Sequence, residues 1–247
     1  MNPYASLCDD FYVTMNLATE MELPSNRETV LHFFEQIQKT YPTMRNFYCR
    51  ERGDFVLEED KEKGSYRWCT IEPRRISSGH VNPESIEDVL KQHRLVLELS
   101  PYSLSVSPLD CEALDLLFVF DFTYQGNHNQ LMTEALGVSP ALEGIADLPG
   151  ALVINHEPSI IVALNEDCRT QFRVSVETRT TTYQIRTSDF PEEQLSVYVS
   201  ARQYGSLGPD ATFVETLDRL AGICHDMIES HVTEHVLNPL ARTIALK

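Results

Sequence analysis

The most regular hydrophobic pattern in the chain lies between Ala113 and Tyr124. Every second residue on one side of this stretch is large and apolar or aromatic, namely Leu114, Leu116, Phe118, Phe120, Phe122 and Tyr124. The other side is apolar at its centre, at Leu117 and Val119, and polar toward both ends. Because successive side chains of a strand point to opposite faces of a sheet, both faces must be covered at the centre. The pattern therefore predicts the central strand of the main sheet, with helices on one side and further apolar cover on the other.

The segments before this strand predict an α+β arrangement with two helices. The first helix is expected to begin near Ser25 and Glu28, which have the spacing of a capping box, and to end at Pro42. The second is expected to begin at Asn82 and Pro83, with Asn82 as the N-cap. Segments rich in β-forming residues predict strands at residues 11–17, 45–49, 55–57, 65–71 and 102–106. This order indicates a ferredoxin-like first half with the pattern β-α-β-β-α-β.

The second half predicts an antiparallel meander followed by one long helix. Asn127 or Asn129 is expected to cap a short helix that ends at Gly137. The meander is predicted from strand patterns at residues 151–155, 159–164, 171–177, 181–185 and 194–201. The longest helix is predicted over residues 211–236, and Asn238 and Pro239 are expected to break it.

This pattern suggests two lobes joined by a loop. Residues 1–138 form the expected α+β lobe, residues 139–150 a joint rich in proline and glycine, and residues 151–247 an antiparallel sheet with its C-terminal helix. A single continuous domain is the alternative. We find no convincing residue-level repeat between the halves, and a structural duplication stays open.

Composition narrows the class of protein. The chain has 247 residues, of which 42% are hydrophobic, so it can bury a sizeable core without disulfides or metal. Its six cysteines are scattered and form no C-x-x-C pair, which favours reduced thiols and a cytoplasmic location. The net charge of −17 repels phosphate backbones and anionic lipid, so we expect neither nucleic acid nor membrane as a partner. No cofactor is predicted.

The order of these features resembles a sporadically distributed bacterial family of uncharacterised proteins of about this length. The matching features are Trp68 in a predicted hairpin, the helix at 86–97, the apolar strand at 114–122, and the strand and long helix at 195–236. The resemblance implies the same order of elements. It implies no activity, because the family carries none that is established.

The sharpest chemical motif is H-x-x-E-H in the last helix, formed by His231, Glu234 and His235. In metallopeptidases of the inverted type, two histidines at this spacing bind Zn²⁺ and the glutamate acts as general base. No Asp, Glu, His or Cys follows that could be the third ligand, and a helical projection places both histidines on the apolar stripe with Cys224 and Ile228. We therefore interpret them as packing or capping histidines, with a metal-dependent hydrolase as the alternative function.

Two further groups are candidates for ligand binding. Arg74, Arg75 and His80 form a basic run in an acidic chain, and clustered arginines can hold a carboxylate or phosphate. His128 follows the predicted central strand, where ligand sites often lie. Surface ion pairs explain the arginines equally well, and a strand-to-helix turn explains the loop around His128.

No nucleotide-binding glycine motif or nucleophile motif is present. The sequence therefore favours a soluble, non-catalytic protein that binds a protein partner or a small ligand. An oligomer formed through the long helix or an exposed sheet edge is a further expectation. An anion-binding module built on the basic run is the third alternative.

Overall fold

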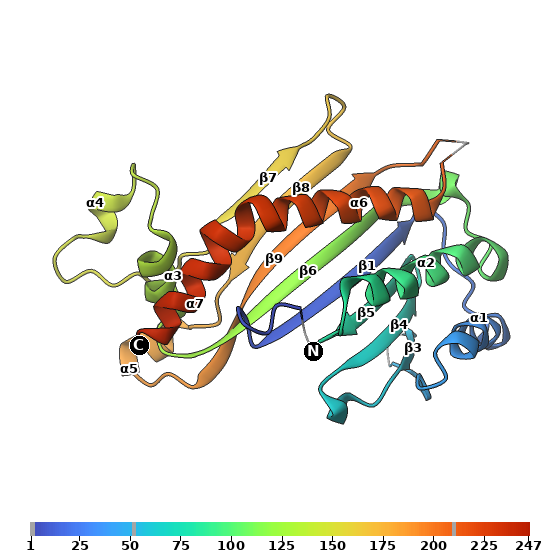
Figure 1. Cartoon of the computed structure of the whole chain (residues 1–247), viewed down its shortest axis with the longest axis horizontal. Coiled ribbons are helices and arrows are strands. Elements are labelled where there is room, and N and C mark those ends of the chain that lie inside the picture. The colour runs from blue at the N-terminus through green and yellow to red at the C-terminus, as the bar shows by residue number, and fades with distance from the viewer. Residues whose placement is uncertain (1–2, 51–52, 209–210) are drawn as a thin grey trace.

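Nine strands from both halves of the chain form one antiparallel sheet. The computed structural model describes residues 3–50, 53–208 and 211–247. The strands are β1 (Asp10–Thr19), β2 (Asn46–Cys49), β3 (Phe55–Glu58), β4 (Tyr66–Glu72), β5 (Arg75–Val81), β6 (Cys111–Gln125), β7 (Ser159–Ala163), β8 (Thr170–Glu177) and β9 (Glu192–Tyr204). Their order in the sheet is β2-β3-β4-β5-β1-β6-β9-β8-β7 (Figure 1), and every neighbouring pair is antiparallel.

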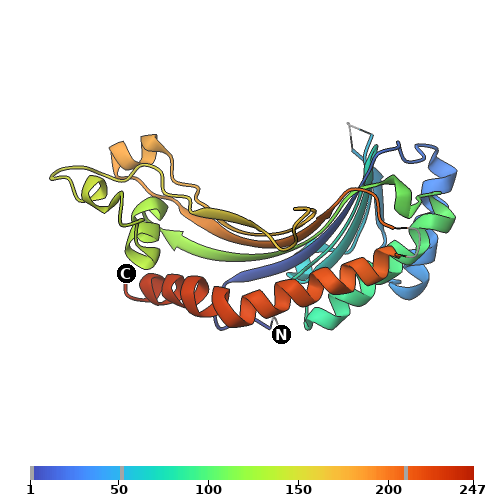
Figure 2. The ribbon, with the colours of Figure 1, turned by 90° about the horizontal axis from the view of Figure 1, so that it is seen from above.

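The long helices lie against one face of this sheet, and the opposite face is concave (Figure 2). The helices are α1 (Arg27–Thr40), α2 (Ile86–Ser103), α3 (His128–Leu136), α4 (Glu143–Ala146), α5 (Thr182–Thr187), α6 (Phe213–Met227), the π-helical segment η3 (Ile228–Leu237) and α7 (Asn238–Ala245), with short 3-10 turns η1 (Lys61–Lys63) and η2 (Pro108–Asp110). Helix α6 packs on β6 and β9, and α2 packs on β5. Among the described residues, no helix has both the length and the apolar character needed to cross a membrane.

The core lies between the sheet and these helices. On β1 the residues that point toward the helices, Phe11, Val13, Met15 and Leu17, are completely buried. On β6, every second side chain from Leu114 to Phe122 points toward the helices in the same way and is buried. The apolar side of the amphipathic helices meets these two rows, so burial of apolar surface fixes which face of each strand is polar.

Strand β6 lies inside the sheet between β1 and β9, as predicted, but the cover on its second face differs from the prediction. On the concave face Val119 is buried, whereas Leu117 is only half-buried. Tyr12 on β1 and Tyr198 on β9 are the direct neighbours of Val119 and shield it from both sides. The three long helices α1, α2 and α6 all lie on the other face (Figure 2), so side chains of adjacent strands provide the shielding.

The two halves repeat one order of elements. The first runs β1, α1, then β3-β4-β5 and α2, and the second runs β6, α3, then β7-β8-β9 and α6. In the sheet, the two sets extend in opposite directions from the neighbours β1 and β6. The duplication that the sequence left open is therefore present in the topology. Strand β2 in the first half and helices α4 and α5 in the second have no counterpart.

The ferredoxin-like pattern is not found in the first half, because four strands lie between α1 and α2. The strand that sequence analysis missed is β5. Its centre, Ser77-Ser78-Gly79, consists of residues with low preference for strands. It forms nevertheless, because β5 pairs with β1 on one side and β4 on the other.

Both predicted helix caps in the first half are displaced. Asn26, rather than Ser25, caps α1 by accepting a hydrogen bond at 2.8 Å from the backbone N–H three residues later. Ser85, rather than Asn82, caps α2. Asn82 instead has a φ of 46° and accepts a 2.9 Å hydrogen bond from the backbone N–H of Phe11, so it ties the end of β5 to β1.

Three predicted strands and one predicted helix end are also wrong. Residues 102–106 form the end of α2 and the turn after it, residues 151–155 pair with no strand among the described residues, and residues 181–185 enter α5. A capping box between Thr181 and Gln184 favours the helix there. Pro239 does not break the last helix, because it lies in the first turn of α7, where its missing N–H is not needed.

Candidate functional site

The concave face carries the polar side chains that alternate with the core residues. Two hollows open on it and share Asn16 of β1 as a common wall. The first, which we call the β8 hollow, lies over β6, β7, β8 and β9, and its lining includes Leu117, Arg173 and Tyr198. The second, the Trp68 hollow, lies over β3, β4 and β5 and is named after one of its lining residues. Each half of the duplicated sheet therefore carries one hollow.

A chain of polar contacts crosses four neighbouring strands between the hollows. Ser77 Oγ donates to Asn16 Oδ1 at 2.7 Å, and Asn16 Nδ2 donates to Asp115 Oδ2 at 3.0 Å. Arg202 completes the chain through an ion pair of 3.1 Å with the other oxygen of Asp115. Asp115 is buried, so its carboxylate needs these partners. These polar contacts fix the orientation of the side chains that separate the two hollows.

The β8 hollow has a volume of about 470 Å³. Arg173, Ser200 and Leu117 lie side by side across β8, β9 and β6. The guanidinium group of Arg173 is exposed and forms no ion pair with any residue that the structure describes. Burial raises the pKa of Tyr198, so its hydroxyl stays protonated and able to donate. This hollow thus offers one cation without an ion pair to a described residue, beside hydroxyl, apolar and carboxylate groups, among them Glu157 and Glu177.

The Trp68 hollow has a volume of about 320 Å³. Its rim has two ion pairs, Lys61 with Glu58 at 3.0 Å and Arg75 with Glu72 at 2.6 Å. Trp68 is half-buried on β4 and lies among these charges. The hollow thus combines an aromatic ring with paired charges that a ligand could reach.

The lining of both hollows offers groups that can hold a polar ligand. The described residues around them provide hydroxyls, amides, carboxylates, cations and aromatic rings, but no histidine or cysteine. The arrangement is therefore suited to holding a polar ligand in a fixed orientation.

The structure does not bring the predicted basic run together. Arg74 lies in the exposed turn between β4 and β5, and Arg75 points to the concave face at the rim of the Trp68 hollow. His80, five residues after Arg75, points to the helix side of the same strand and is buried. The alternation of side chains along a strand separates them. The structure therefore does not place all three side chains on one face of the sheet.

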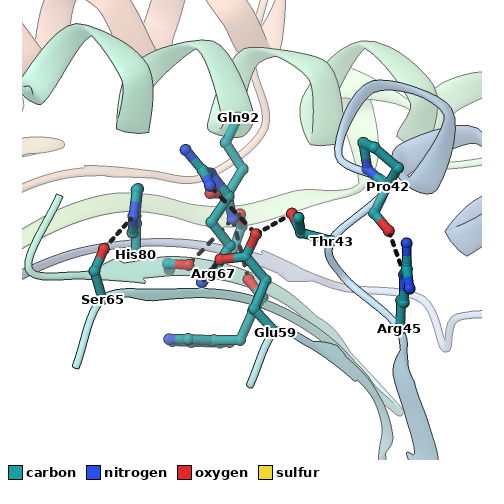
Figure 3. Close-up of polar contacts among 11 residues, drawn as sticks. Pro42, Thr43, Arg45, Glu59, Ser65, Arg67, His80 and Gln92 are labelled. Atoms are coloured by element: carbon teal, nitrogen blue, oxygen red, sulfur yellow. Dashed lines mark hydrogen bonds and ion pairs between the residues drawn. The ribbon is translucent and has the colours of Figure 1, made fainter. Parts of the chain in front are cut away.

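His80 belongs to a buried polar cluster beneath α2 (Figure 3). Ser65 Oγ lies 3.3 Å from its Nε2, and Arg67 and Glu59 lie nearby on the same side of the sheet. Glu59 accepts from the backbone N–H of Arg67 at 2.8 Å and from the hydroxyl of Thr43. Burial, together with the charge of Arg67, lowers the pKa of His80 to about 4. His80 is therefore neutral at pH 7 and cannot attract an anion by its charge.

The cluster continues onto α2 through Gln92 and His93. Gln92 Nε2 donates to Ser78 Oγ at 2.9 Å, and His93 Nδ1 lies 3.1 Å from the same hydroxyl. Both side chains are completely buried. Burial and the neighbouring His80 lower the pKa of His93 to about 3. Gln92 and the neutral imidazole of His93 thus attach α2 to the sheet through Ser78.

His128 is held by contacts with the backbone of two neighbouring segments. Its Nδ1 accepts a 3.2 Å hydrogen bond from the backbone N–H of Arg179, and its Nε2 lies 3.3 Å from the carbonyl oxygen of Tyr124. Burial lowers the pKa of its imidazole. The predicted cap of this helix is confirmed at Asn127. His128 thus joins the start of α3 to the segment before α5, and it faces neither hollow.

The histidines of the H-x-x-E-H motif lie on the surface. His231, Glu234 and His235 are exposed on η3, while Val232 and Leu237 face the core. The interpretation of the histidines as part of the apolar stripe is therefore wrong, because the π-helical turns of η3 change the phase of the helix. Among the described residues, no group of three potential ligands is arranged to hold a metal ion. The structure thus adds no third ligand to the motif.

A third hollow differs in character from the other two. It has a volume of about 410 Å³ and is lined almost entirely by apolar side chains around α4. We call it the apolar hollow, and its exposed residues are Leu142, Ile145, Leu148, Leu152 and Ile154. The segment around α4 that lines it lies beyond the end of the sheet near α3 (Figure 1), within and just after the residues predicted to be a joint.

Sequence analysis missed the residues of the concave hollows. Asn16, Asp115 and Arg202 belong to three strands distant in sequence, and only the register of the sheet brings them together. Comparison with known protein families finds no family that matches the chain, and comparison with curated proteins finds no match. The geometry of the site is therefore the basis for the functional argument.

Proposed function

We propose that the protein is a non-catalytic binding protein and that the concave face of its sheet holds a polar ligand. The observation that carries this proposal is the pair of hollows that meet at Asn16. Their volumes, about 470 and 320 Å³, lie within or near the range of small-molecule sites. The Trp68 hollow is lined by three cations and two carboxylates in a chain of net charge −17, which favours an anionic ligand there. The β8 hollow is lined by two arginines and three carboxylates, and Arg173 is its cation without an ion pair to a described residue.

Side chains of the proposed ligand face are already held in place before a ligand binds. The hydrogen bonds of Asn16 with Ser77 and Asp115 hold the Asn16 side chain, which separates the two hollows, in one orientation. A ligand therefore need not order these side chains when it binds, which removes part of the entropic cost.

Thermal unfolding in the presence of defined anions tests the proposal. Inorganic phosphate, succinate, benzoate and adenosine monophosphate are added separately, and unfolding is followed by circular dichroism. A ligand at one hundred times its dissociation constant adds about 2.7 kcal/mol, which raises the Tm of a chain of this size by roughly 5–10 °C. We expect at least one anion to do so. The proposal fails if none raises the Tm, or if the effect persists after Arg75→Glu and Arg173→Glu are combined.

A second candidate function is self-association through the edge strand β7. This strand ends the sheet order, and Ile160 and Ile161 are 62% and 57% exposed on it. The apolar hollow lies close to it in the chain. All five residues of β7 are uncharged, so two copies could pair along this edge without charge repulsion at the contact. We propose a second copy of the chain as the occupant of this surface.

Sedimentation across a dilution series tests this candidate. The wild type is expected to have twice the chain mass of 28.2 kDa, and Ile161→Lys is expected to be a monomer. Leu109→Lys is the matched control, because Leu109 is equally exposed, at 66%, but lies on η2 away from β7. A monomeric wild type, or a dimer that survives Ile161→Lys, contradicts the candidate.

A further inference from the structure

Trp68 is positioned by a glycine that no other residue could replace without displacing the ring. Trp68 on β4 is the direct neighbour of Gly79 on β5, and both lie on the concave face. A Cβ atom at Gly79 would stand 2.3 Å from Cε2 of the indole, much closer than atoms can approach. The indole therefore lies over the backbone of β5 in the space that a side chain would fill, and its remaining surface lines the hollow.

The cations around this ring outnumber the carboxylates. Arg50, Lys61 and Arg75 line the Trp68 hollow, against Glu58 and Glu72. Glu58 is paired with Lys61 and Glu72 with Arg75, while Arg50 forms no ion pair with the described part of the chain. The hollow thus has a local excess of positive charge in a molecule whose net charge is −17. This reversal of sign indicates attraction of an anion to this part of the concave face.

Hydroxyl groups stand beside the ring on the floor of the hollow. Thr70 follows Trp68 on the same face of β4, and Ser77 is its neighbour on β5. Both are buried, and Ser77 is oriented by its hydrogen bond to Asn16. Polar groups at fixed positions beside an aromatic surface give a ligand one preferred orientation.

We propose that the Trp68 hollow binds a planar aromatic anion of mononucleotide size or smaller. The aromatic part of the ligand stacks on the indole of Trp68, and its phosphate or carboxylate group is held by Arg75 together with Arg50, which forms no ion pair with the described part of the chain. A volume of about 320 Å³ is at the lower end of ligand sites, which favours a single ring system with one anionic group. The inference rests on the proposed function, in which the concave face is the ligand face, and specifies the ligand class for one of its hollows.

The chain contains one tryptophan, so tryptophan emission, excited at a wavelength that tyrosine does not absorb, reports on this hollow alone. The probes are adenosine monophosphate, adenosine, ribose 5-phosphate and benzoate. Stacking on an aromatic side chain changes affinity by roughly five- to one-hundred-fold, and contacts to a charged group have a similar effect. We expect saturable changes in fluorescence with adenosine monophosphate or benzoate. Adenosine and ribose 5-phosphate should each bind at least about tenfold more weakly than adenosine monophosphate.

Variants separate the roles of the ring and the cations. Arg75→Gln is expected to weaken binding by roughly tenfold or more, while Lys39→Gln, the control at an exposed position of α1 away from both hollows, leaves it unchanged. Trp68→Leu, followed by calorimetry because it removes the fluorophore, is expected to lose the preference for adenosine monophosphate over ribose 5-phosphate. Equal affinity of the wild type for these two compounds would overturn the inference.

The outcomes also distinguish this inference from the proposed function. If an anion raises the Tm but leaves Trp68 fluorescence unchanged, the ligand lies elsewhere on the concave face, and only the inference fails. If no probe changes either the Tm or the fluorescence, both fail. If fluorescence changes but Arg75→Gln has no effect, the assignment of the anionic group to Arg75 is wrong.

Discussion

Replacement of His93 by glutamine is expected to make the protein less sensitive to acid. His93 is completely buried beneath α2, and burial together with His80 lowers its pKa to about 3. In the unfolded chain its pKa returns to about 6.5. Between these two values the unfolded state binds more protons than the folded state. The free energy of unfolding therefore falls as the pH falls from about 6.5 toward 3.

The size of the effect follows from the two pKa values. At pH 4.5, two units below the unfolded value, His93 lowers the free energy of unfolding by roughly 2–3 kcal/mol relative to pH 7.5. His80, whose pKa is about 4, responds in the same direction and keeps its effect in the variant. Glutamine can still contact Ser78 but does not titrate, so the variant should lose roughly 2–3 kcal/mol less than the wild type over this interval.

Urea unfolding at both pH values measures this difference. For each protein we compare the free energy of unfolding at the two pH values. A loss of stability that the substitution causes equally at both pH values therefore cancels. His32→Gln, at an exposed position on α1, is the matched control and should behave as the wild type. A loss of stability in acid that is identical in the wild type and in His93→Gln would refute the reasoning about the buried cluster.

Two further predictions concern the concave face. Gly79→Ala should cost roughly 1–3 kcal/mol by overpacking against the indole and should shift the emission of Trp68. Gly144→Ala, in α4 with open space around it, should neither destabilise the protein nor shift this emission. Urea unfolding and emission spectra measure both effects. Phe120→Ala, on the helix side, should cost about 3–5 kcal/mol, and Leu117→Ala, half-buried on the concave side, clearly less. Equal costs at these two positions in urea unfolding would contradict the assignment of the faces.

The local features that could be predicted from sequence are those that burial dictates. The alternation around Phe118 and Phe120 predicted an interior strand, because a one-residue shift would move its entire apolar row into water. The hairpin partners β3 and β4, the helix capped by Asn127 and the long helix that begins near Phe213 follow similarly from hydrophobic pattern and capping residues.

Features set by tertiary contacts escaped sequence analysis. Strand β5 contains Ser77, Ser78 and Gly79, and its pairing with two neighbours overrides their low strand preference. Gly79 also makes room for Trp68, and nothing in the local sequence connects the two. The candidate site depends on the register between strands, so individual residues such as Asn16 had no signal to distinguish them from other polar strand residues.

The central claim is that the concave face of the sheet is the ligand-binding face. Calorimetric titration with adenosine monophosphate tests it on three proteins: the wild type, a variant that combines Arg75→Glu and Arg173→Glu, and a control that combines Lys39→Glu and Lys91→Glu on exposed positions of α1 and α2. We predict saturable heat for the wild type and the control, and none for the variant with reversed charges in the hollows. Binding that survives in that variant, or is lost in the control, would contradict the claim.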